Sequence, residues 1–120
     1  MFLKFKAHSP ANKLIIEVLG FHSIELFTHT LSRSANAIGA VFLDDQRPAI
    51  ASTISGSFQE NGAILLSLKL EIIAGSMDLK TFRYRAGPVG DGTLFFNSLS
   101  NSAILDGTLK SRIQISEYEV

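Results

Sequence analysis

The sequence predicts an all-β protein, built as an antiparallel β-barrel or β-sandwich of about eight to ten short strands. Three observations lead to this fold class. Apolar residues recur at every second position over several segments, which is the period of a half-buried strand. Polar turn sequences separate these segments at intervals of roughly a dozen residues, and strands do not alternate with helices. A chain of 120 residues with this pattern is expected to form one domain, spanning residues 1–120.

The first elements lie on either side of Pro10. Residues 2–6 have the composition of a short strand, which ends before this proline. Two alternatives are open for residues 11–19. Pro10 at the first helical position and Gly20 just past the end would frame a short helix, whereas the β-branched residues of the segment favour a strand. We favour the strand, because a lone short helix would need a sheet face or a barrel end to cover its apolar side.

Two further strands are predicted before the middle of the chain. Residues 21–31 carry apolar side chains on both faces, as expected for a strand that is buried on both sides or contains a bulge. Residues 36–43 form the next strand, with Ile38 and Phe42 on one face. The turn-forming residues and the proline of 44–48 end it.

The centre of the sequence predicts a β-hairpin. Residues 50–58 and 64–73 both alternate, and Glu60-Asn61-Gly62 lies between them. Asn-Gly accepts the positive φ angles of a tight turn, so we expect the two strands to pair antiparallel. The face expected to be buried contains Ile50, Ile54, Phe58, Ile64, Leu66, Leu68, Leu70 and Ile72. The small residues on the opposite face of the first strand are either solvated or approached by another sheet or subunit.

Three strands are expected in the last third of the chain. They span residues 77–86, 93–97 and 105–116, separated by turns at 87–92 and 98–102. The first turn contains three glycines, but it lacks the lysine of a phosphate-binding loop and leads into a strand instead of a helix. We interpret it as a long turn.

Composition excludes several functional classes. Eleven basic and eleven acidic residues give a formal net charge of zero, which argues against a surface dedicated to nucleic acid or to an anionic membrane. The absence of cysteine excludes disulfides and thiolate chemistry and favours a cytoplasmic location. We interpret residues 1–6 as no signal peptide, and we expect no membrane helix because no apolar window is long enough for one. An apolar fraction of 46% in a neutral chain favours self-association.

The histidines are the first candidates for chemistry. His22 and His29 are seven residues apart, which places them on opposite faces of one strand, so we expect no metal site and no cofactor. Either residue would serve as an acid–base catalyst if a carboxylate lay within hydrogen-bond reach. Asp44 and Asp45 would suit a hard cation, but their place after a strand is typical of an ordinary turn.

Two sets of residues are candidates for ligand binding. The first alternates cations with aromatic residues and would stack bases or hold a sugar or an anion: Lys80, Phe82, Arg83, Tyr84 and Arg85, with Lys110 and Arg112 on a possible neighbouring strand. The simpler interpretation places Phe82 and Tyr84 in the core and the two arginines in solvent. The second set would line the cavity of a closed barrel: Phe42, Phe58, Leu66, Leu68 and Phe96.

Three functions are compatible with these observations. The first is a non-catalytic binding or assembly module that self-associates through sheet surfaces as a homo-oligomer. The second is a calycin-like carrier of a small apolar molecule. The third is an enzyme that uses a histidine and a carboxylate as acid and base. We expect neither a nucleic acid nor a membrane as a partner.

Overall fold

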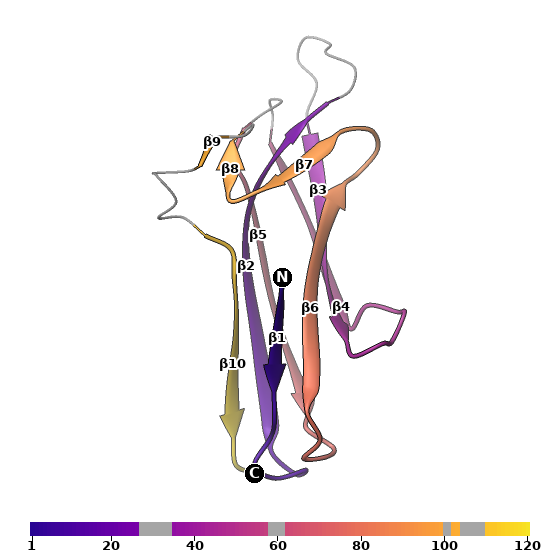
Figure 1. Cartoon of the computed structure of the whole chain (residues 1–120), viewed down its shortest axis with the longest axis vertical. Helices are drawn as coiled ribbons and strands as arrows, with labels where there is room; N and C mark the ends of the chain where they lie inside the picture. The colour runs from indigo at the N-terminus through magenta and orange to yellow at the C-terminus, as the bar shows by residue number, and fades with distance from the viewer. Residues whose placement is uncertain (27–34, 58–61, 100–101, 104–109) are drawn as a thin grey trace.

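The computed structural model is a sandwich of two antiparallel sheets that contains only β-strands in the described part of the chain (Figure 1). The structure describes residues 1–26, 35–57, 62–99, 102–103 and 110–120. The strands are β1 (Phe2–Phe5), β2 (Lys13–Glu25), β3 (Ala35–Leu43), β4 (Ala51–Ser57), β5 (Ile64–Ile73), β6 (Lys80–Pro88), β7 (Thr93–Phe96), β8 (Ser98–Leu99), β9 (Ser102–Ala103) and β10 (Arg112–Tyr118). No helix long and apolar enough to cross a membrane occurs among these residues.

Each sheet is open at both edges. The first sheet has the strand order β1-β6-β3-β4, and the second has the order β10-β2-β5, with β7 pairing to the far end of β2. β8 and β9 form a small separate ladder at one end of the sandwich, whereas the C-terminus lies at the other end (Figure 1). Since neither sheet closes on itself, the sandwich alternative is confirmed and the barrel alternative is wrong.

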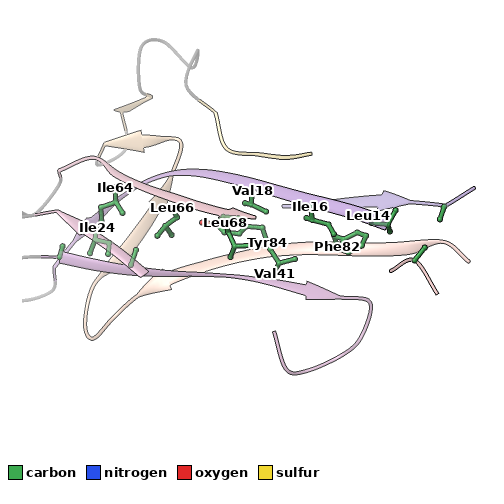
Figure 2. Packing of buried hydrophobic residues seen from close by; sticks show 14 of the residues in the cluster. Leu14, Ile16, Val18, Ile24, Val41, Ile64, Leu66, Leu68, Phe82 and Tyr84 are labelled. Carbon is green, nitrogen blue, oxygen red and sulfur yellow. The ribbon is translucent and has the colours of Figure 1, made fainter. Parts of the chain in front are cut away.

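The core lies between the two sheets and is built by the alternation seen in the sequence. In β2, Leu14, Ile16 and Val18 are buried, whereas the residues between them are partly or fully exposed. β5 contributes Ile64 and Leu66 from the same sheet. The first sheet adds a second set of inward side chains opposite them: Ala37, Val41, Phe82 and Tyr84. Figure 2 shows the larger of these side chains, from Leu14, Ile16 and Val18 to Val41, Phe82 and Tyr84, in the space between the two layers.

The helix alternative for residues 11–19 is wrong, because residues 13–19 are the first part of the 13-residue strand β2. The strand pairs with β5 on one side and with β10 on the other, so β-branched residues are favoured along it. It also runs through Gly20 without interruption. A Cβ atom at Gly20 would lie 2.5 Å from Nε2 of His22 and 2.5 Å from the Tyr84 hydroxyl oxygen. The glycine is therefore required by close packing and does not end a helix.

The predicted central hairpin is also wrong. β4 pairs with β3 in the first sheet, and β5 pairs with β2 in the second, so these consecutive strands lie in different sheets. The side chains of β4 face the opposite way from the prediction. Ile54, which was expected to be buried, is 65% exposed, whereas Ala51 packs against the core. β4 of the first sheet lies against β5 of the second sheet. The inward side chains of β4 are small, which leaves room for the larger side chains of β5. Phe58 and Asn61 lie outside the described residues.

Most of the other predicted strands are confirmed with shifted boundaries, but the separate strand predicted from residue 21 is wrong, because residues 21–25 continue β2 without a break. β1 and β3 lie close to their predicted positions, and β7 covers most of residues 93–97. β6 begins at Lys80 and continues through Pro88, which pairs with Ala37, so the turn that follows is shorter than predicted. Residues 98–102 include β8 and the start of β9 instead of a simple turn. Only the last part of the 105–116 prediction falls in described β10, and residues 27–31 lie outside the described range.

Candidate binding surface

The structure separates the predicted ligand-binding residues into three places. Phe42, Arg83 and Arg85 lie on the outer face of the first sheet. Four others are buried between the sheets: Leu66, Leu68, Phe82 and Tyr84. Phe96 lies in β7 and is 39% exposed, and Phe58 is outside the described range. The residues expected to line one barrel cavity therefore do not share one, because Phe42 faces away from the core.

Arg83 and Arg85 border a surface groove of about 280 Å³ where β3 ends. The register places Arg83 opposite Phe42 and Arg85 opposite Ala40, so both arginines project from the same face as Phe42. The turn after β3 supplies the other wall of the groove. Its complete lining is Phe42, Asp44, Asp45, Gln46, Arg47, Arg83 and Arg85.

The turn after β3 is tied to β6 through Asp44. The amide of Asp44 donates to the carbonyl oxygen of Thr81 at 2.8 Å, and the amide of Thr81 donates to Asp44 Oδ1 at 2.8 Å. Asp44 has a φ angle of 50°, a left-handed conformation that aspartate tolerates better than most residues. Gln46 closes the turn, since its amide donates to the Leu43 carbonyl oxygen at 3.1 Å. These contacts fix the position of the loop beside the arginines.

Both arginines of β6 are oriented by neighbouring groups. Arg83 Nη1 donates to the carbonyl oxygen of Asp44 at 3.1 Å and lies 3.9 Å from Asp45 Oδ1. The guanidinium carbon of Arg85 lies 5.9 Å from the centre of the Phe42 ring, within the range of a cation–π interaction. The carboxylate of Asp45 is fully exposed, so its attraction for Arg83 is weakened by solvent.

The other cations of the predicted cluster do not reach this groove. Lys80 is buried, and its Nζ donates to the carbonyl oxygen of Ser76 at 3.0 Å and to Ser76 Oγ at 3.1 Å. Arg112 belongs to β10, which pairs with β2 in the second sheet, so the expectation that Lys110 and Arg112 lie on a strand next to β6 is wrong. The groove obtains its third cation from Arg47 in the turn instead.

A buried polar pair joins the two sheets. Tyr84 of β6 and His22 of β2 are both inaccessible to solvent, and the Tyr84 hydroxyl oxygen lies 2.7 Å from His22 Nε2. His22 Nδ1 lies 3.3 Å from the carbonyl oxygen of Phe95, which only accepts hydrogen bonds, so we place the imidazole proton on Nδ1. The Tyr84 hydroxyl then donates to Nε2. The Phe96 ring packs edge-on against His22, with 4.4 Å between the ring centres.

Burial keeps both members of this pair neutral. Removal from water lowers the pKa of His22 below its ordinary value of 6.5, although the hydrogen bond to the Phe95 carbonyl opposes this shift. Burial likewise raises the pKa of Tyr84 well above its ordinary value. Since the partner of His22 is a tyrosine and not a carboxylate, the pair does not supply the acid–base arrangement expected of an enzyme.

The other described histidine, His8, marks a contact between the two ends of the chain. Its backbone amide donates to Glu117 Oε2 at 2.8 Å, and Asn12 Nδ2 donates to the same oxygen at 2.6 Å. The Asn12 hydrogen bond is the main reason why the pKa of Glu117 is lowered. Within the described residues no group of three or more potential ligands is arranged to hold a metal ion.

β4 exposes an apolar pair at one edge of the first sheet. Ile54 of β4 stands directly opposite Ile38 of β3 on the outer face, and the two side chains are 65% and 40% exposed. β3 is the only strand that pairs with β4 among the described residues. The second side of β4 therefore presents backbone donors and acceptors that no described strand uses.

No protein-family model matches this sequence, and no curated protein matches it significantly.

Sequence reasoning missed two features of this surface. Gln46 and Arg47 join the groove because the Asp44–Thr81 contacts fold their turn against β6, and this contact leaves no periodic signal in the sequence. The exposure of Ile54 was missed because either parity of β4 is compatible with its alternation. The absence of charge throughout β4 is a sequence signal that distinguishes this strand from the long edge strands β5 and β10.

Proposed function

We propose that this chain is a non-catalytic binding and assembly module that self-associates through β4. In this arrangement the β4 strand of a second copy pairs antiparallel with β4 and extends the first sheet across a two-fold axis. The exposed Ile54, located on an edge strand that pairs with β3 alone among the described strands, carries the proposal. Addition of a strand to a sheet edge satisfies backbone hydrogen-bonding groups and is a recurrent mode of protein association.

Charge distinguishes β4 from the other long edges of the sandwich. The edge strand β5 carries Lys69 and Glu71, and the edge strand β10 carries Arg112 and Glu117. Charged side chains on edge strands discourage pairing with another chain. β4 consists of alanine, serine, threonine, isoleucine and glycine only, with no charge and no proline over its 7 residues. It therefore lacks the features by which proteins usually block an edge.

The composition of β4 also favours a second copy as the partner. An antiparallel two-fold pairing centred on Ile54 would place this side chain opposite Ile54 of the partner subunit and Thr53 opposite Ser55 of the partner subunit. The two exposed isoleucines would then cover each other. In each subunit Ile54 lies beside Ile38, so the pairing would form a continuous apolar row across the outer face of the extended sheet. The formal net charge of zero means that two copies experience no long-range repulsion. A cytoplasmic location, favoured by the lack of cysteine, is part of this proposal.

Light scattering coupled to size-exclusion chromatography tests the proposal. Wild-type protein is expected to approach the mass of two chains as its concentration rises through the micromolar range. Ile54→Lys should remain at the mass of one chain, because it places two ammonium groups near the two-fold axis. Ile73→Lys is the matched control, since Ile73 is 58% exposed on the edge strand β5 of the other sheet, and it should dimerise like the wild type. A monomeric wild type, or equal effects of both substitutions, would contradict the proposal.

A further inference from the structure

The groove at the end of β3 combines three cations with two anions, which gives its lining a formal charge excess of one positive charge. It is lined by three arginines and two aspartates, Arg47, Arg83, Arg85, Asp44 and Asp45, on a chain whose formal net charge is zero. Asp44 directs Oδ1 to the amide of Thr81, which offsets part of its charge. Arg47 and Arg85 form no ion pair within the described part of the chain. The groove is therefore a local positive site on an otherwise balanced surface.

We infer that this groove binds a small oxyanion, either a carboxylate or a phosphate group. The planar guanidinium group presents paired N–H donors that match the two oxygens of a carboxylate or phosphate, which a single ammonium does not. Two of the three arginines are already oriented before any ligand arrives. Arg83 is held by the Asp44 carbonyl oxygen, and Arg85 is held against the Phe42 ring. This reduces the side-chain entropy lost on binding.

The size of the groove limits the ligand to a small molecule or a single group of a larger one. Its volume of about 280 Å³ lies just below the range of roughly 300–1,000 Å³ that is usual for ligand sites in proteins. Phe42 is half-buried in the wall and offers an apolar contact beside the cations. A phosphate, or a carboxylate on a short carbon skeleton, satisfies both the volume and the chemistry of the lining.

The oxyanion site is separate from the proposed dimer interface. The groove is formed by β6, the end of β3 and the turn that follows, whereas the interface lies on the free side of β4. Ile54→Lys should therefore leave anion binding unchanged. Failure of the dimer proposal would not affect this site, and failure of this site would not affect the dimer proposal.

Nitrogen–proton correlation spectra of the full chain, titrated with sodium phosphate and separately with sodium acetate, test the inference. Sodium chloride at matched ionic strength is the reference. With at least one of the two anions, we expect saturable chemical-shift changes confined to the backbone amides near Asp44–Arg47 and Arg83–Arg85. The anion that causes these changes identifies the ligand class. Chloride should not reproduce them. Shifts that fail to saturate with both anions, or that chloride reproduces, would overturn the inference.

Substitutions test whether these chemical-shift changes arise from anion binding in the groove. The double variant R47Q/R85Q should weaken binding at least about tenfold, since each charge-assisted hydrogen bond to an anion contributes strongly. Both side chains project from the surface, and a thermal melt confirms that the variant is folded. Arg112→Gln, an exposed arginine in the second sheet, is the matched control and should titrate like the wild type. Wild-type affinity in R47Q/R85Q would overturn the inference.

Discussion

The hydroxyl group of Tyr84 lies 2.7 Å from Nε2 of His22, so the two sheets are joined by a hydrogen bond between buried side chains. Neither side chain has access to solvent. A buried donor or acceptor that loses its partner cannot turn to water instead, so each group depends on the other.

Tyr84→Phe should therefore destabilise the protein. The phenyl ring keeps the packing, but His22 Nε2 is left without a donor, which costs about 1–3 kcal/mol for a buried group. Urea denaturation measures the change in the free energy of unfolding. Tyr118→Phe is the control, because Tyr118 is exposed in β10 and its loss of a hydroxyl should change stability by no more than about 0.5 kcal/mol. Equal stability of both variants would show that the hydrogen bond does not stabilise the fold.

Stability should also fall when the pH is lowered through the titration of His22 in the unfolded chain. The folded-state pKa of His22 lies below its ordinary value of 6.5, so below pH 6.5 the unfolded state binds a proton that the folded state does not. The unfolded state is then favoured by up to about 1.4 kcal/mol per pH unit until the folded-state pKa is reached, and the effect vanishes well above pH 6.5.

The measurement is the free energy of unfolding between pH 5.5 and 7.5, compared for the wild type and His22→Gln. The variant should lose the part of the slope that belongs to His22. Glu117 does not interfere, because its lowered pKa contributes stability that is lost only as the pH falls below about 4.5. An unchanged slope in His22→Gln would mean that His22 titrates alike in both states.

Gly20 and Gly39 should be intolerant of a methyl group, because the Tyr84 ring lies between them. A Cβ atom at Gly39 would lie 2.8 Å from the Tyr84 hydroxyl oxygen and 3.0 Å from Leu66 Cδ1, and the contacts at Gly20 are closer still. Alanine at either position is expected to cost about 1–3 kcal/mol through overpacking. Gly87→Ala is the control, because a Cβ atom added there would have no neighbouring atom within 4 Å. Chemical denaturation of the three variants checks this, and three equal midpoints would contradict the packing.

The Asp44 contacts should hold the groove in shape. Asp44→Ala removes the acceptor for the Thr81 amide and places a residue that disfavours positive φ in the left-handed region. We expect a loss of about 1–2 kcal/mol in stability. Asp45→Ala is the control, since the Asp45 side chain is fully exposed and its substitution should be nearly neutral. Thermal unfolding distinguishes the two, and a neutral Asp44→Ala would show that the turn does not depend on this residue.

Alternation in the sequence predicted most of the strands because it reports directly on a local property. Leu14, Ile16 and Val18 face the core, as do Phe82 and Tyr84, and each side-chain orientation follows from the strand geometry alone. The same local pattern does not determine which strands become neighbours. Nothing in the Asn-Gly turn signal indicates that β4 and β5 belong to different sheets, since that depends on how the whole chain packs.

The candidate sites show the same difference between local sequence patterns and contacts made over long sequence distances. Arg83 and Arg85 were identified from their interleaving with aromatic residues, because this pattern is contained in one strand. The pairing of His22 with Tyr84 joins residues that are 62 positions apart, so no spacing rule reveals it. The sequence around Gly20 is also typical of a helix end, and only the His22 and Tyr84 side chains packed against it explain why it must be glycine.

Hydrogen exchange of the backbone amides, measured at two protein concentrations, tests self-association through β4 most directly. Pairing of two β4 strands should make the exchange of amides within Ala51–Ser57 slower at the higher concentration, while amides of the charged edges β5 and β10 exchange at unchanged rates. Exchange in β4 that is independent of concentration, or slowing confined to β5 or β10, would contradict the account.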